Sequence, residues 1–278
     1  MKKTILSSIL ILFLLNFSAL FAQTVATLTP AGAINTSGKQ RFLSQRMGKN
    51  FIFLTFGLNP EIAQRELASS KIIFEENLKA LKAFPANEVI KQKLDKEEKL
   101  WLEYKKLLEL EPNRVNATNI LNYNTALLTA TDDVVQEYVK YTSELKNKTE
   151  SVSAATVAVN TNTSGRIRML SQRLTLYYGA YYSDCGDAAV NLKTLKAAGE
   201  AIQASLSQLI TSDINTSEID DSLSDLIIDW HEIEERCTKD NCLTFENKQM
   251  DPKQMFTVCN KMLSKVDKAV GMYAKLLD

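Results

Sequence analysis

The sequence has few of the residues on which most catalytic and metal sites depend. One histidine, His231, stands alone and no CxxC pair occurs, so we expect neither a zinc site nor a histidine-based catalytic centre. No glycine-rich phosphate loop is present among only nine glycines. Lysine and arginine (33) balance aspartate and glutamate (33), which excludes the basic surface of a nucleic-acid-binding protein. The sequence therefore predicts a non-enzymatic protein without metal, cofactor or nucleic-acid partner, with His231 at the surface or capping a helix.

Proline and glycine are also scarce, with five and nine among 278 residues. Because these residues interrupt regular structure, long stretches rich in Ala, Leu, Lys, Glu and Ile are typical of an all-α protein.

The N-terminus has the order of an export signal. Lys2 and Lys3 precede a short apolar run, which is followed by the small residue Ala22. The run is shorter than the roughly 20 residues of a membrane-spanning helix, so an uncleaved anchor is the weaker alternative. No cysteine follows it, which argues against a lipid anchor. We expect a signal peptide at 1–22 and a periplasmic or secreted bacterial protein.

Helical periodicity divides the remainder into two similar halves. Four blocks, 29–58, 60–84, 86–111 and a block from about 116, end near prolines or polar turns. The third places Ile90, Leu94, Trp101, Tyr104 and Leu108 in one buried stripe, and the second suggests a stripe of Ile62, Ile72, Ile73, Leu78 and Leu81. The pattern restarts after 160, with blocks at 192–209, 219–236 and 255–277.

The blocks predict two tandem up-and-down four-helix bundles, at 23–150 and 151–278. No proline or glycine occurs between Pro112 and Gly165, so the bundles could be joined by one continuous helix in an elongated rod. The Asn, Thr and Ser residues of 159–164 favour a break instead. We expect the continuous helix.

Four cysteines lie in the second half, all expected at one end of its bundle. In an oxidising compartment an even number favours disulfides over zinc. The simplest pairing is Cys237 with Cys242 and Cys185 with Cys259, and the alternative is Cys185 with Cys237 and Cys242 with Cys259.

One stretch recurs almost unchanged: NTSGKQRFLSQRM at 35–47 and NTSGRIRMLSQRL at 162–174 are identical at nine of thirteen positions. At 100° per residue, one helical face carries Leu43, Met47 and Leu54, matched by Leu170, Leu174 and Tyr181, and should enter the bundle core. The opposite face should point out of the bundle and carries Gly38, Arg41, Gln45 and Gly48, matched by Gly165, Arg168, Gln172 and Thr175.

This outward face combines small residues with a guanidinium group suited to oxyanions. Packing against another helix in a homodimer explains the small residues equally well. Asn-Thr-Ser-Gly could serve only as a helix start, whose free amides also attract anions. Arg46 and Arg173 could be ordinary solvated or salt-bridged residues.

The pattern Asn-x-x-Gly-x-x-Arg-x-x-Ser-Gln-Arg resembles the signature of the PilJ-type domain, found at the N-terminus of type IV pili methyl-accepting chemotaxis transducers. It is similar to the P-box of NarX-type nitrate sensor kinases. The resemblance covers both copies and implies a helical sensor fold, with Arg41 and Arg168 contacting an anion at a dimer interface and Gly38 and Gly165 allowing close approach. Ser-Gln-Arg departs from the bulkier aromatic step of the nitrate sensors, and no second membrane span, signalling helix or kinase is present.

The sequence therefore predicts an exported, non-enzymatic sensor module that binds a small anion (nitrate- or nitrite-like) or a partner protein. The candidate ligand-binding residues are Gly38, Arg41, Gln45, Gly165, Arg168 and Gln172. The candidate binding partners are a small anion, a membrane signalling protein and a second copy of the chain in a homodimer. The alternative is a structural or assembly protein of the cell envelope whose repeated motif packs helices.

Overall fold

A computed structural model describes residues 28–146, 152–239, 242–246 and 250–276. The expected signal peptide lies outside these residues. The first half contains α2 (Pro30–Thr55), α3 (Pro60–Lys82), α4 (Glu88–Leu108) and α5 (Arg114–Lys146). The second half contains α6 (Val152–Tyr182), α7 (Ala188–Ile210), α8 (Ser217–Cys237), β1 (Thr238–Lys239), β2 (Cys242–Leu243) and α9 (Pro252–Lys275). The two strands form only a short antiparallel pair, so the all-α prediction is confirmed.

Local chemistry sets several helix starts. Thr29 caps α2 by accepting a hydrogen bond from the Gly32 amide, and Asn87 caps α4 through the Ile90 amide. Pro30, Pro60 and Pro252 occupy the first turns of α2, α3 and α9, where proline's fixed φ suits the helix and its missing N–H costs nothing. These capping residues and prolines can be recognised in the sequence.

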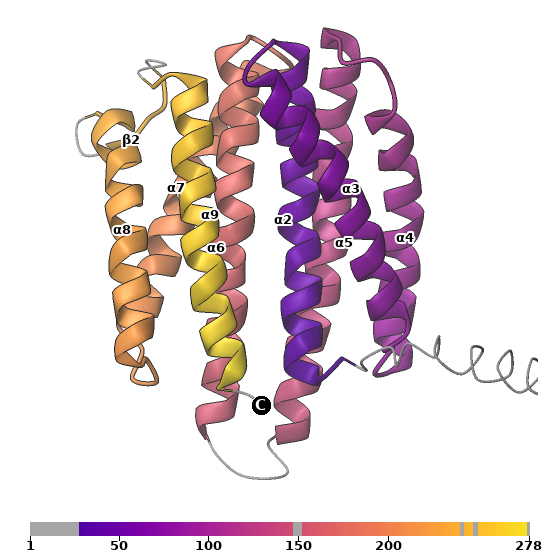
Figure 1. Cartoon of the computed structure of the whole chain (residues 1–278), viewed down its shortest axis with the longest axis vertical. Helices are drawn as coiled ribbons and strands as arrows, with labels where there is room; N and C mark the ends of the chain where they lie inside the picture. Colours follow the sequence, from indigo (N-terminus) through magenta and orange to yellow (C-terminus); the bar gives the residue numbers. More distant parts are fainter. Residues whose placement is uncertain (1–27, 147–151, 240–241, 247–249, 277–278) are drawn as a thin grey trace, which may run out of the picture.

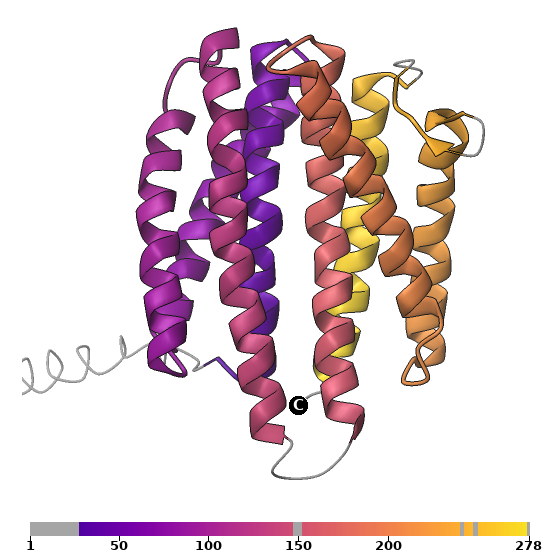
Figure 2. The ribbon, with the colours of Figure 1, turned by 180° about the vertical axis from the view of Figure 1, so that it is seen from behind.

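The two halves stand side by side, not end to end. Figures 1 and 2 show α2 and α6 running parallel in the middle of the molecule, with the other helices of each half to either side. α5 and α6 contact each other and run in opposite directions, which one straight helix through both could not do. The junction at 147–151 lies outside the described residues, but the expected elongated rod is wrong.

Aligned aromatic residues of the two halves occupy similar places. Trp101 and Trp230 are each buried. Tyr138 donates to the Phe84 carbonyl at 2.8 Å, and Tyr273 donates to Asn215 Oδ1 at 2.5 Å. The structural repetition supports the duplication read from the sequence, whereas the division into domains 23–150 and 151–278 stays a prediction.

One hydrophobic core runs through both halves, because α2 and α6 bury apolar residues against their own bundles and against each other. Leu43, Met47, Leu170 and Leu174 are buried as expected, and the α4 stripe is confirmed. The expected stripe of α3 is partly wrong. Leu78 and Leu81 are buried as expected, but Ile62, Ile72 and Ile73 are exposed. The buried face of α3 also includes Ala63, Glu66, Leu67, Ser70 and Phe74.

The predicted disulfides are not formed. Cys185, Cys237 and Cys259 are free and buried, so neither proposed pairing exists. Cys185 follows α6 and lies 3.8 Å from Thr118 of α5, whereas Cys259 lies within α9, 3.7 Å from Met255 Sδ. Burial raises the pKa of Cys237 to about 11 and that of Cys259 to about 12, which keeps these thiols protonated and unreactive.

Within the described ranges, no helix has both the length and the apolar character needed to cross a membrane.

The close approach of α2 and α6 predicts the effect of a methyl group at Gly179. A Cβ there would lie 2.8 Å from Cε2 of the buried Phe53 ring, whereas a Cβ at Gly271 of α9 would meet open space. Gly179→Ala should therefore lower the melting temperature by several degrees, since overpacking costs about 1–3 kcal/mol. Gly271→Ala should leave it unchanged or raise it, because alanine favours the helix by up to about 1 kcal/mol. Calorimetry that found both variants equally stable would contradict this packing.

Candidate functional site

The repeated motif lies within helices, not at their starts. α2 begins at Pro30 and α6 at Val152, so both Asn-Thr-Ser-Gly segments are helical. Ser37 donates to the Ala33 carbonyl and Ser164 to the Asn160 carbonyl, each at 2.7 Å. The interpretation of these residues as a helix start with free amides is therefore wrong.

The outward face of each copy meets the other copy. We call this buried contact between α2 and α6 the seam. Arg41 of α2 donates from Nη1 to Asp132 Oδ1 at 2.8 Å within its own half, and from Nη2 to Asn162 Oδ1 of the second half at 2.8 Å. The second copy makes the reciprocal contacts. Arg168 donates from Nη1 to Asp267 Oδ1 of its own half at 2.6 Å, and from Nη2 to Asn35 Oδ1 of the first half at 3.0 Å.

Glycine lets both guanidinium groups lie close to the backbones of α2 and α6. A Cβ on Gly38 would lie 3.4 Å from Nη2 of Arg168, and a Cβ on Gly165 would lie 3.3 Å from Nη2 of Arg41 and 3.4 Å from Nη2 of Arg168. Both guanidinium groups therefore border the same space above Gly165. The glycine-arginine spacing in the sequence reflects this contact within one chain, so a homodimer through this face, one of the expectations, is wrong.

The seam encloses two like charges. Arg41 and Arg168 are each 1% exposed, and their Nε atoms have no hydrogen-bond partner in the structure. Burial lowers the pKa of both groups, with Asp132 and Asp267 opposing the shift, and repulsion from Arg41 lowers that of Arg168 further. Both aspartates are about half exposed, at 44% and 54%, so water weakens their compensation. The arrangement leaves buried donors available to an additional acceptor.

The glutamines and the second arginines of the motif lie farther along the seam. Arg173 crosses from the second half and donates to Gln45 Oε1 at 2.9 Å. Its counterpart Arg46 instead pairs with Glu66 of α3 at 2.9 Å. Gln172 Oε1 is buried and has no hydrogen-bond partner among the described residues. Gln45 and Gln172 are fully buried. Of the two interpretations of these arginines, the salt-bridged one holds for Arg46, which pairs with Glu66. Arg173 is not simply solvated, because it donates across the seam to Gln45.

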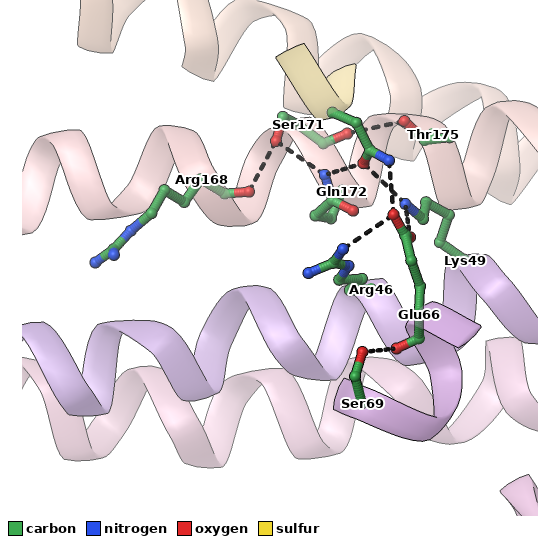
Figure 3. A network of polar contacts seen from close by, with 9 residues as sticks. Arg46, Lys49, Glu66, Ser69, Arg168, Ser171, Gln172 and Thr175 are labelled. Carbon is green, nitrogen blue, oxygen red and sulfur yellow. Dashed lines mark hydrogen bonds and ion pairs between the residues drawn. The ribbon is translucent and has the colours of Figure 1, made fainter. Parts of the chain in front are cut away.

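A cationic cluster that sequence reasoning missed adjoins the motif (Figure 3). Lys49 of α2 is fully buried and contacts Glu66 Oε2 and Asn260 Oδ1 of α9, both at 3.0 Å. Its ammonium also lies 3.8 Å from the centre of the Phe256 ring. Asn260 donates to Glu66 Oε1 at 2.9 Å, so the cluster joins the two halves.

The charges of this cluster depend on each other. Burial lowers the pKa of Lys49 to about 8, although Glu66 opposes the shift. Burial alone would raise the pKa of Glu66, but the charges of Lys49 and Arg46 outweigh it and hold that pKa at about 2. The aligned second copy has Leu176 at the position of Lys49, and this mismatch was the signal in the sequence.

A second missed group is Glu97, which lies on the buried stripe of α4 between Leu94 and Trp101. Gln40 donates to its Oε1 at 3.2 Å, and its Oε2 has no hydrogen-bond partner in the described part of the chain. Burial raises the pKa of Glu97 to about 8, so the carboxyl group is largely protonated at neutral pH. The second half has Ile167 and Leu226 at the corresponding positions. The sequence could have indicated this buried carboxyl group, because Glu97 has the same helical spacing as the apolar residues of the stripe.

His231 lies exposed on α8, with Nδ1 2.7 Å from Glu234 Oε2. Among the described residues, no three His, Cys, Asp or Glu side chains gather as metal ligands would. The site therefore consists of the seam and its two neighbouring polar groups.

Comparison with known proteins supports a sensor-type reading of the first half. Residues 28–129 match the protein family described as "Type IV pili methyl-accepting chemotaxis transducer N-term", PilJ. The match spans α2, α3, α4 and the first part of α5, and it includes Gly38, Arg41 and Gln45. No curated protein and no solved structure matches the chain. The similarity indicates a sensor-type module, and a second copy of this domain stays a prediction.

The cationic cluster of Lys49, Arg46 and Glu66 predicts that Glu66→Gln lowers the free energy of unfolding. The variant leaves the ammonium of Lys49 buried without a carboxylate, so we expect a loss of about 3 kcal/mol at pH 7. In a Lys49→Leu background, which copies Leu176, the same change should cost at most about 1 kcal/mol. Urea unfolding of the four proteins would measure this coupling, and equal losses in both backgrounds would contradict it.

The buried Glu97 predicts a pH-dependent stability. Its pKa is about 8 in the folded protein, above the ordinary 4.5, so the folded state binds the proton more tightly and stability falls as pH rises from about 4.5 to about 8. Glu97→Gln removes this titration. Relative to the variant, the wild type should lose at least about 1 kcal/mol over that range. Exposed Glu76→Gln is the control, and parallel stability profiles for wild type and Glu97→Gln would contradict the assignment.

Proposed function

We propose that the chain is an exported sensor module whose two fused bundles hold a small, singly charged oxyanion between Arg41 and Arg168. The observation that carries the proposal is the common space bordered by both guanidinium groups above Gly165. In a two-chain sensor such a space would require dimerisation. Here the second half of the chain supplies it.

The electrostatics of the seam favour an anion. Two buried like charges repel each other, and each retains an Nε–H to which no described residue offers an acceptor. A planar oxyanion between them would accept several charge-assisted hydrogen bonds and reduce the repulsion. Asp132 and Asp267 offset part of the two guanidinium charges, so a singly charged ligand fits better than a doubly charged one. Nitrate and nitrite have this charge and shape.

Such a module acts by binding, and we propose no catalytic role. An anion can shift the protein only if it binds two arrangements of the helices with different affinities. The exchanged arginine bonds provide a contact at which α2 and α6 could move relative to each other. A membrane signalling protein in the same envelope compartment would then read that change.

The alternative is a purely structural seam in an envelope assembly protein. It is favoured by the partners that Arg41 and Arg168 already have, since each guanidinium is bonded to an aspartate and an asparagine. In this alternative the duplicated motif only joins the two halves. No small anion would bind.

Titration calorimetry and thermal-shift measurements with nitrate, nitrite, formate and acetate separate the two functions. We expect the wild type to bind at least one of these anions, and Arg41→Lys and Arg168→Lys each to weaken binding at least about tenfold, because lysine keeps the charge but lacks the planar fork.

Exposed Arg65→Ala serves as the control and should bind like the wild type. Circular dichroism verifies that the lysine variants are folded. A wild-type protein that responds to none of the anions would refute the sensor proposal in favour of the structural seam.

A further inference from the structure

A groove lies beside the seam, between the two halves. It has a volume of about 390 Å³ and is walled by α5 of the first half and by α6 and α7 of the second. Leu128 and Met169 contribute apolar surface, and the remainder of the lining is mainly polar. The volume is at the lower end of ligand pockets, about 300–1,000 Å³, which suits a molecule of a few heavy atoms.

One wall of the groove is acidic. Asp132 uses only Oδ1, which accepts from Arg41 at 2.8 Å and from Gln136 at 3.5 Å, while no hydrogen bond to its Oδ2 is found in the described part of the chain. Among the described residues, Asp133 beside it has only a long contact with Lys96, at 3.5 Å, between two exposed side chains. Both carboxylates therefore have capacity for a cation.

The opposite wall carries the guanidinium group of Arg166. Arg166 of α6 is exposed and lines the groove with the two aspartates, yet it makes no ion pair or hydrogen bond with any residue that the structure describes. Opposite charges thus face each other across the groove without contact. A ligand with one charge only would be attracted to one wall and repelled by the other.

We propose that this groove binds a small zwitterion of the amino-acid class, with its ammonium at Asp132 Oδ2 and Asp133 and its carboxylate at Arg166. Asn162 and Gln208 lie in the same lining and can supply neutral hydrogen bonds. The molecule would bridge the two walls, each of which has a charge available for it.

The corresponding surface of the second half lacks this charge pattern. Lys39 aligns with Arg166 and Asp267 with Asp132, but Lys268 aligns with Asp133 and Gly271 with Gln136. The acidic pair is thereby replaced by one acid and one base, with a second cation opposite. The zwitterion site is therefore confined to one side of a duplicated structure, and the other side supplies a matched control.

The position of the groove gives such a ligand a route to the seam. Asp132 is the partner of Arg41, and the walls belong to different halves of the chain. An ammonium at Asp132 would compete with Arg41 for the carboxylate and so alter the seam. This inference does not require an anion between the arginines, because the two sites use different cationic residues.

Titration calorimetry with glycine, alanine, β-alanine, γ-aminobutyrate and glycine betaine tests the proposal, with acetate and methylammonium as single-charge probes. We expect at least one zwitterion to bind the wild type at least ten times more tightly than either probe. Arg166→Ala and Asp133→Lys, which copies the other half, should each weaken binding at least tenfold. Lys39→Ala should bind like the wild type.

Absence of zwitterion binding by the wild type would overturn the proposal, as would equal binding of a single-charge probe. Loss of affinity in only one of the two groove variants would also overturn it, since a zwitterion needs both walls. Nitrate binding that depends on Arg41 and Arg168 is measured separately. Its failure would therefore refute the anion proposal and leave the groove unaffected.

Discussion

The structure depends on two buried arginines, each of which finds a hydrogen-bond partner in the opposite half of the chain. A guanidinium without water must be paired, and a single aspartate at the rim satisfies only part of it. Arg41 needs Asn162, and Arg168 needs Asn35. This reciprocal need explains why asparagine, glycine and arginine recur together. It also explains why the halves lie side by side, since an end-to-end rod would leave both arginines without their partners.

The repeated motif has a two-fold arrangement at the seam, and the residues around its two copies differ. Lys49 faces the second half where the other copy has Leu176, and Glu97 occupies a core position that the other copy fills with Leu226. In each comparison the first half is polar and the second is apolar. A chain that contains both partners of a dimer can specialise each side, which identical subunits cannot do. The groove beside Asp133 has the same origin.

Much of the helical structure was predictable because it depends on neighbours in sequence. Prolines mark the starts of α2, α3 and α9, and the stripe of α4 from Ile90 to Leu108 is buried as its spacing predicts. The stripe of α3 was misread because Ile72 and Ile73 are apolar but exposed, and exposed apolar residues are common on protein surfaces. The disulfides were misjudged because cysteine number and compartment say nothing about the distance between Cys185 and Cys259.

The sequence by itself determined the helices, the repeated motif and the face of each motif copy that leaves its own bundle, because all three follow from patterns along one chain. Only the tertiary structure decided what meets that face. The contacts of Arg41 with Asn162, of Lys49 with Asn260 and of Gly179 with Phe53 join residues more than a hundred positions apart. Their formation depends on the side-by-side docking of the two halves, which no local pattern encodes.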